Sequence, residues 1–170
     1  KKLTSAGYYE RMDVSNTQLV RQIIKDYEIT TVYHLASLLS GTSERQPHFA
    51  WKLNVEPLLN FLEMAKEGLI QKIFWPSSIA VFGKGIPKEN VGQDVVLNPT
   101  TVYGISKMAG EKWCEYYFDK YGVDVDDIHN IEEILSDKFK SQYCLKITKT
   151  NVISEDKKYI GYLKLDKISV

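Results

Sequence analysis

Short apolar strands that alternate with amphipathic helices are the feature that most restricts the fold of this chain. Residues 31–36 form a β-prone run without a formal charge, which is typical of a strand buried on both faces of a parallel sheet. The other predicted strands of this region are 7–14, 71–75 and 123–125, and the predicted helices are 19–27, 50–67 and 102–121. This order with short links predicts an α/β fold, a parallel sheet with helices on both faces.

Local signals mark where these helices begin and end. Ser15 followed by Gln18 has the form of a capping box, in which the two side chains satisfy each other's backbone donors. Gly68 and Gly122 are predicted to end the second and third helices, because glycine readily adopts the left-handed conformation that closes a helix. Irregular loops are expected over 41–47 and 83–99, which are rich in polar residues or in Gly, Pro and Asn.

The pattern changes after Val125. Asp126 and Asp127 break the strand, and apolar residues over 128–139 recur at the spacing of an amphipathic helix. Residues 143–147 alternate and 159–165 are β-prone, with a predicted turn at 154–158. We therefore expect two parts: residues 1–125, and a tail over residues 126–170 that holds a helix and a β-hairpin.

Composition excludes several classes of function. The chain has 22 basic and 22 acidic residues, so it has no net attraction to nucleic acid or to an anionic membrane. Cys114 and Cys144 do not stand in C-x-x-C spacing, which argues against a disulfide framework or a metal site. No apolar run approaches the roughly 20 residues that cross a bilayer, and nothing resembles a signal peptide. We expect a protein of the cytoplasm.

Tyr103 and Lys107 are the first candidates for chemistry. Residues four apart on a helix share one face, and an ammonium beside a phenol favours the phenolate. A tyrosine, which normally titrates near pH 10, can then act as a base closer to neutrality. Ser78, which follows a predicted strand, offers a hydroxyl that can hold a substrate oxygen. Tyr-x-x-x-Lys pairs arise by chance in many helices, so their surroundings decide how much weight this pair carries.

Those surroundings resemble the extended short-chain dehydrogenase/reductase family, to which NAD-dependent epimerases and dehydratases belong. Within it, residues 7–125 are most similar to the short-chain type of L-threonine 3-dehydrogenase. Ser78 and Tyr103 are 25 residues apart, as in the family. Thr101-Val102 before the tyrosine favours the threonine enzymes, because sugar-nucleotide enzymes more often read P-x-x-P-Y-G-x-S-K there. The segments that carry the resemblance are Phe74–Gly83, Thr101–Lys107 and Ala109–Tyr117.

The resemblance implies a role for each matching residue. Tyr103 would remove the proton from the substrate hydroxyl, Lys107 would assist it and bind the nicotinamide ribose, and Ser78 would fix the reacting oxygen. Ser40 would approach the substrate. The implied cofactor-binding residues are Asp13 at the adenine, Leu35 and Ala36 along the cofactor path, the helix residue Asn54, Ser77, Tyr103 and Lys107. The cofactor would be NAD, and no metal is implied.

Simpler interpretations stand beside these roles. Asp13 can merely introduce a helix, Asn54 can satisfy backbone groups, and the two serines can start a loop. His34, inside an apolar strand, is expected to be a packed core histidine. The aromatic group around α-helical residues 113–121 is expected to pack against other helices, and in this family that helix pairs across a homodimer. The aromatic residues are Trp113, Tyr116, Tyr117, Phe118 and Tyr121.

Two family segments are not found in this sequence. No G-x-x-G-x-x-G turn, whose amides hold a pyrophosphate, precedes Gly7, and the resemblance stops near Val125 before a substrate-binding lobe. Residues 1–125 therefore look like an incomplete NAD-binding, partial Rossmann-like domain, and residues 126–170 like a tail of unknown origin. We expect weak turnover, and exposed strand edges unless dimerisation or the tail covers them.

Three functions remain open. The favoured one is an NAD-dependent oxidoreductase that oxidises L-threonine to 2-amino-3-oxobutanoate, impaired by truncation. The second is a sugar-nucleotide epimerase or dehydratase, whose small-molecule substrate would be a nucleotide sugar rather than an amino acid. The third is a non-catalytic remnant of the family that acts at most as a dimerisation module.

Overall fold

Seven strands of the described residues form one sheet in the order β1-β2-β7-β6-β3-β4-β5. The computed structural model describes residues 2–4, 7–84, 96–126, 143–149 and 161–167, and side chains over 11–84 and 96–125. The strands are β1 Lys2–Thr4, β2 Gly7–Met12, β3 Thr31–His34, β4 Lys72–Phe74, β5 Asp124–Asp126, β6 Tyr143–Lys149 and β7 Gly161–Lys167. The helices are α1 Thr17–Asp26, α2 Ser40–Arg45, α3 Pro47–Asn54, α4 Glu56–Lys66 and α5 Val102–Tyr121, with a 3₁₀ turn, η1, over Ile79–Val81.

The parallel part of the sheet is where the strands over 31–36, 71–75 and 123–125 were predicted. β3 pairs in parallel with β4, and β4 pairs in parallel with β5. Val32 lies opposite Ile73, and both side chains are fully buried. The helices after β3 and β4 carry the chain back so that the next strand starts at the same end of the sheet. The predicted α/β, Rossmann-like fold is therefore confirmed.

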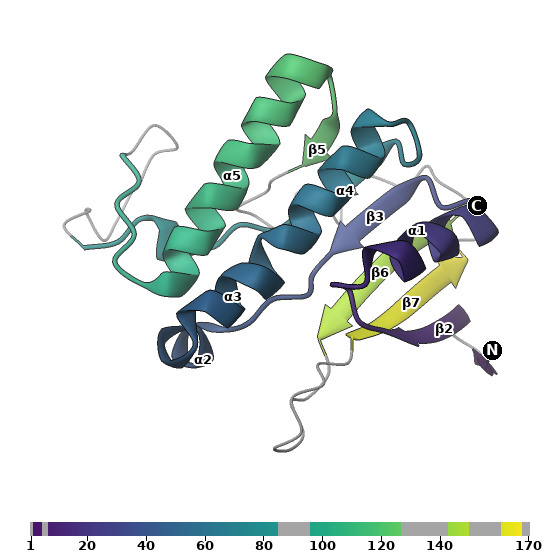
Figure 1. The fold of residues 1–170 in the computed structure, drawn as a ribbon, viewed down its shortest axis with the longest axis horizontal. Coiled ribbons are helices and arrows are strands. Elements are labelled where there is room, and N and C mark those ends of the chain that lie inside the picture. Colours follow the sequence, from purple (N-terminus) through teal and green to yellow (C-terminus); the bar gives the residue numbers. More distant parts are fainter. Residues whose placement is uncertain (1, 5–6, 85–95, 127–142, 150–160, 168–170) are drawn as a thin grey trace.

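The predicted hairpin of the tail lies inside this sheet. β6 and β7 pair with each other in antiparallel orientation, β6 pairs in parallel with β3, and β7 pairs antiparallel with β2. The hairpin lies between β2 and β3 and covers the facing edge of each (Figure 1). The sequence predicts exposed strand edges unless dimerisation or the tail covers them, and here the tail does so. The helix predicted over 128–139 and the turn predicted over 154–158 lie outside the described residues.

The first helix begins at a different cap from the one predicted. Asn16, not Ser15, is the capping residue of α1, and its side chain accepts a hydrogen bond of 3.1 Å from the Leu19 amide. The Ser15 amide instead donates to the Asp13 carboxylate at 2.9 Å. This Asx turn keeps Ser15 outside the helix, so the predicted capping box at Ser15 and Gln18 is wrong.

The second predicted helix is two helices. α3 ends at Asn54 and α4 begins at Glu56, with a break at Val55. Pro57 explains the break, because proline has no amide hydrogen to bond the carbonyl four residues earlier and is best tolerated in the first turn of a new helix. The short helix α2 also occupies most of the loop predicted over 41–47, and the Ser43 hydroxyl donates to the Leu38 carbonyl at its start.

The third predicted helix, α5, has the predicted bounds. Thr101 caps its first turn, since its hydroxyl oxygen accepts a hydrogen bond of 3.0 Å from the Gly104 amide. Gly122 ends it in the left-handed conformation, with φ of +68°. Both ends are fixed by local residues, which is why the sequence sufficed to place them.

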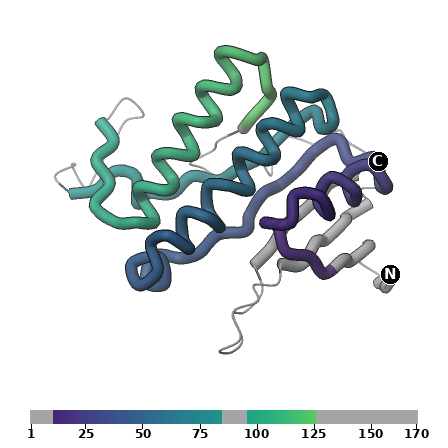
Figure 2. Tube along the Cα trace, in the orientation of Figure 1, coloured from purple at the N-terminus to yellow at the C-terminus, as the bar shows by residue number. Residues whose placement is uncertain are grey.

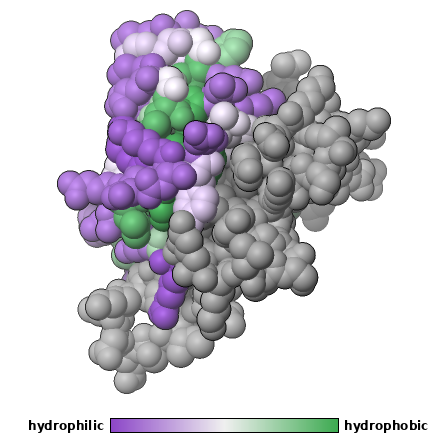
Figure 3. Space-filling view, turned by 90° about the vertical axis from the view of Figure 1, so that its right-hand side faces the viewer, coloured by the Kyte–Doolittle hydropathy of each residue, from purple (hydrophilic) through white to green (hydrophobic). Residues whose placement is uncertain are grey.

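The described helices pack together in front of the sheet in the view of Figure 1, so the α/β fold is confirmed while the helices predicted on the second face are not found among the described residues. Figure 2 shows α4 and α5 running side by side. α4 contacts both α1 and α5, and the Tyr117 hydroxyl of α5 donates to the Glu63 carboxylate of α4. The apolar core lies between this layer and the strands. Seen from the side on which α1 lies, the described surface is mostly hydrophilic, with a narrower hydrophobic area (Figure 3). Within the described residues, no helix has the length and apolarity to cross a membrane.

Candidate active site

The candidate site lies where β4 ends and α5 begins. β2, β3 and β4 run in the same direction, so their carboxyl ends share one edge of the sheet. In sheets of this kind ligands bind outside that edge. The residues that follow the three strands there are Asp13 after β2, Leu35 and Ala36 after β3, and Trp75 to Ser78 after β4.

Gly104 allows the first turn of α5 to touch the turn that carries Ser78. A Cβ atom at Gly104 would lie 2.3 Å from the Ala80 carbonyl oxygen, which no real side chain tolerates. Ser78 caps this 3₁₀ turn, its hydroxyl oxygen accepting a hydrogen bond of 3.3 Å from the Ala80 amide. The close approach brings the backbone around Ser78 against the helical turn that begins at Val102 and carries Tyr103.

Lys107 is buried on the inner face of α5. Its side chain is 3% exposed, and Nζ donates a hydrogen bond of 2.6 Å to the Pro76 carbonyl. Nζ also lies 4.1 Å from the centroid of the Trp75 ring and 5.8 Å from that of the Tyr103 ring. Burial lowers the pKa of Lys107 to about 8, against the opposing effect of the nearby Glu111 and Cys114. The ammonium is thus held beside a tyrosine in a poorly solvated place.

Tyr103 and Ser78 are both half-buried and therefore reachable from solvent. The Tyr103 carbonyl accepts a hydrogen bond of 2.7 Å from the Ser106 hydroxyl, which fixes this turn of α5. The structure brings Tyr103 and Lys107 together on one helix face and places Ser78 two residues after the carbonyl that Lys107 binds. Their catalytic roles stay predictions.

Asn54 joins the segment after β3 to α5. Its side chain is 2% exposed and accepts a hydrogen bond of 2.6 Å from the Leu38 amide. Its amide group donates to the Leu38 carbonyl and to the Ser106 hydroxyl, both at 3.2 Å. These bonds match the interpretation that Asn54 satisfies backbone groups; contact with a cofactor stays a prediction.

The other predicted binding residues lie along the same edge. Asp13 and Ser40 are exposed, Leu35 is half-buried and Ala36 is buried. Ser40 is the first residue of α2, whose Glu44 carboxylate accepts a hydrogen bond of 2.7 Å from the Val102 amide. α2 is therefore fastened to the start of α5, close in the chain to Tyr103.

His34 is a packed core histidine, as predicted. Its ring is 1% exposed and lies 5.2 Å from the Phe61 ring, centroid to centroid. Among the described residues neither ring nitrogen has a hydrogen-bond partner. Burial lowers the pKa of His34 to about 3, and the charge of Lys107 acts in the same direction. The imidazole is therefore neutral at physiological pH.

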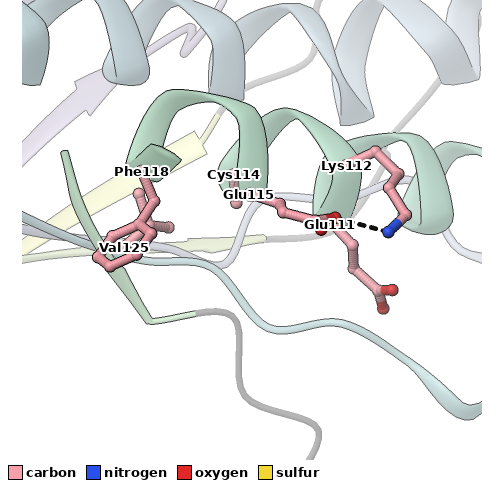
Figure 4. A pocket seen from close by; sticks show the side chains of 6 residues that line it. All are labelled: Glu111, Lys112, Cys114, Glu115, Phe118 and Val125. Atoms are coloured by element: carbon pink, nitrogen blue, oxygen red, sulfur yellow. Dashed lines mark hydrogen bonds and ion pairs between the residues drawn. The ribbon is translucent and has the colours of Figure 1, made fainter. Parts of the chain in front are cut away.

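A hollow lies beside β5, farther along α5 than Tyr103 and Lys107. It has a volume of about 410 Å³. Figure 4 shows the Lys112–Glu115 ion pair at its wall. Neither Tyr103 nor Lys107 lines it, but Glu111, whose carboxylate accepts a hydrogen bond from Ser77, does. Its lining residues are Glu111, Lys112, Cys114, Glu115, Phe118 and Val125.

Sequence reasoning missed the residues that hold this site together. A Cβ at Gly110 would lie 2.2 Å from Cη2 of Trp75, so this glycine lets the Trp75 ring pack against α5. Glycines inside a long helix are unfavourable by about 1 kcal/mol and signal such close approaches. Glu111, a carboxylate that is only 8% exposed, carries no comparable signal in the sequence. Within the described residues, no cluster of three or more His, Cys, Asp or Glu side chains forms a metal site.

Comparison with known proteins identifies the family. Residues 2–126 match the model of the NAD dependent epimerase/dehydratase family. An uncharacterized epimerase/dehydratase of Staphylococcus saprophyticus is 43% identical over 122 residues, which are 72% of this chain and 38% of that protein. The chain thus spans about 38% of the length of the curated relatives it matches.

Several solved structures that resemble this chain are named as L-threonine dehydrogenases. The holo form of a GalE-like L-threonine dehydrogenase from Cupriavidus necator has 44% identity and a TM-score of 0.67, covering 69% of this chain and 38% of that one. The enzyme from Clostridium difficile has 45% identity and a TM-score of 0.65, covering 69% and 36%. A UDP-glucose 4-epimerase from Thermotoga maritima, 22% identical with a TM-score of 0.63 over 67% and 38%, shares the fold. This chain belongs to the NAD-dependent epimerase/dehydratase family.

Proposed function

We propose that this chain carries the proton-transfer site of an NAD-dependent dehydrogenase that oxidises L-threonine to 2-amino-3-oxobutanoate. The observation that carries the proposal is the buried ammonium of Lys107, held by the Pro76 carbonyl beside the Tyr103 ring. Solved structures named as L-threonine dehydrogenases, 36–47% identical to this chain, support the choice of substrate.

The residues of the site divide the task. Ser78 would hold the hydroxyl oxygen of the substrate, and Tyr103 would take the proton from that hydroxyl. Lys107 would stabilise the tyrosyl oxygen as its charge develops, because an unscreened positive charge acts strongly in a poorly solvated site. The cofactor of the family, NAD, would supply the acceptor for the hydride that leaves the carbon bearing this hydroxyl.

The residues at this edge fit the nicotinamide end of that cofactor. Lys107 has ammonium hydrogens besides the one that bonds Pro76, and one of these would bind a ribose hydroxyl. Leu35 and Ala36 would line the path toward Asp13 at the adenine, with Ser77 beside Ser78. Asn54 would act through the Leu38 backbone that it binds.

A second candidate, NAD-dependent chemistry on a nucleotide sugar, is favoured by the family description and by the shared fold of the UDP-glucose 4-epimerase. In either case we propose a homodimer in the cytoplasm.

The experiment uses a hybrid enzyme in which residues 7–125 replace the matching part of the Cupriavidus necator enzyme. NADH formation is measured with L-threonine, and each of a panel of nucleotide sugars is analysed for conversion to product, because epimerases and dehydratases return the hydride and release no NADH. Both assays are run for the hybrid and for its Tyr103→Phe variant. We expect NADH from L-threonine, reduced at least about 100-fold by Tyr103→Phe, and no conversion of the nucleotide sugars. A folded hybrid that binds NAD but leaves L-threonine unchanged would disprove the proposed substrate.

A further inference from the structure

Glu111 is a buried carboxylate next to the proposed site. It lies on α5 four residues after Lys107, and therefore on the same face of the helix. Only 8% of it is exposed, which is uncommon for a glutamate unless it is paired. The Ser77 hydroxyl donates a hydrogen bond to its Oε1.

Lys107 and Glu111 bind consecutive residues of the same turn. Lys107 Nζ bonds the carbonyl of Pro76, and Glu111 bonds the hydroxyl of Ser77. Two side chains one helical turn apart thus attach the end of β4 to α5, immediately before Ser78. A carboxylate and an ammonium on one buried face also stabilise each other's charged forms.

We propose that Glu111 is a positioning residue of this site: it fixes the turn that presents Ser78 and keeps Lys107 positively charged beside Tyr103. The proposal rests on the proposed function for its catalytic meaning. Glu111 itself bonds Ser77 rather than a reacting group, so it acts through Ser77 and Lys107.

The charges around Lys107 determine what the loss of Glu111 would do. Glu111 and Cys114 on α5 favour the protonated lysine, while burial disfavours it. Among the described residues, two other titratable groups face Lys107: Tyr103 on the same helix and His34 on β3. Burial keeps His34 neutral. Burial lowers the Lys107 pKa, and without the Glu111 charge only the weaker effect of Cys114 raises it. A larger fraction of Lys107 is then neutral near pH 8.

The titration of Lys107 tests this directly in the full 170-residue chain. The protein is labelled at lysine Cε with carbon-13, the Lys107 signal is assigned by its loss in Lys107→Met, and its midpoint is followed by NMR. We expect Glu111→Gln to lower the Lys107 pKa by about one unit or more, since an opposite charge at close range shifts a pKa by about 1 to 3 units. Glu111→Asp, which keeps the charge, restores most of the shift.

Glu115→Gln is the matched control, because Glu115 lies on the same helix, is exposed and pairs with the exposed Lys112. It should leave the Lys107 midpoint unchanged. An unchanged midpoint in Glu111→Gln, or an equal shift in Glu115→Gln, would overturn the proposal. If Glu111→Gln does not fold, Glu111→Asp replaces it: the shorter carboxylate should lower the midpoint of Lys107 by a measurable amount of less than one unit, and an unchanged midpoint would overturn the proposal.

The two proposals fail separately. In the hybrid enzyme, Glu111→Gln should move the acid side of the pH profile of L-threonine oxidation to higher pH, because the tyrosyl oxygen loses a neighbouring positive charge. A hybrid that does not oxidise L-threonine would end the proposed function, while the Lys107 titration in the chain would still decide the role of Glu111.

Discussion

The ammonium of Lys107 lies 4.1 Å from the centroid of the Trp75 ring. This cation–π contact buries a charge that water would otherwise solvate, and such contacts contribute about 2 kcal/mol when desolvated. The same ring packs against Gly110. Trp75, which follows β4, therefore fixes how closely α5 and Lys107 approach the sheet.

Gly110→Ala should therefore be destabilising. The new methyl group overlaps the Trp75 ring, which is 1% exposed and has no room to move, so we expect a loss of about 1–3 kcal/mol in the free energy of unfolding. Chemical unfolding followed by tryptophan fluorescence measures it. Gly41→Ala is the control, because nothing lies within 4 Å of a Cβ at Gly41; equal losses in both variants would refute the packing argument.

Stability should fall on mild acidification because of His34. Burial lowers its folded pKa to about 3, below the ordinary 6.5, so the unfolded chain binds a proton that the folded chain does not. The neutral, buried His34 therefore contributes to the free energy of unfolding in full above pH 6.5. This contribution falls by about 1.4 kcal/mol for each pH unit as the pH decreases from 6.5 toward 3. His34→Leu should flatten the decrease between pH 6.5 and 5.5 in thermal unfolding. An unaltered slope would show that His34 is accessible to protons in the folded protein.

The hairpin should be required for a continuous sheet. Leu145 of β6 lies opposite Val32 of β3, in the middle of the parallel pairing. Leu145→Pro removes a backbone donor from a central strand, so β3 and β2 should exchange amide hydrogens faster and the protein should aggregate. Leu145→Val keeps the backbone donor and should behave like the natural chain. Unchanged exchange of the β3 amides in the proline variant would show that the hairpin does not hold β3.

An exposed aromatic cluster on α5 suggests a dimer interface. Tyr117 packs inside the chain, as predicted, but Trp113, Tyr116 and Tyr121 are 38–42% exposed. We expect light scattering at micromolar concentration to give twice the mass of one chain, and Trp113→Glu to give a monomer, because it places a charge in an apolar interface. Asp119→Glu, which alters an exposed residue of the same helix, is the control. A monomeric natural chain would disprove the dimer.

The sequence predicted the elements whose causes are local. β3 was recognisable from its uncharged run, and α5 from Thr101, its apolar spacing and Gly122. Local reasoning failed where two signals competed: Asp13 draws Ser15 out of the first helix, and Pro57 divides the second. The pairing of β6 with β3 and the burial of Glu111 join residues far apart in the chain, and no local pattern encodes such contacts.

The central claim, that the Lys107 charge enables Tyr103 to act, is tested most directly by the rate of L-threonine oxidation in the hybrid enzyme with Lys107→Met. Methionine keeps the apolar stem against Trp75 and removes the charge. The account predicts a loss of at least about 100-fold in kcat with NAD still bound, the scale of general base catalysis. A rate within threefold of the unsubstituted hybrid would contradict it.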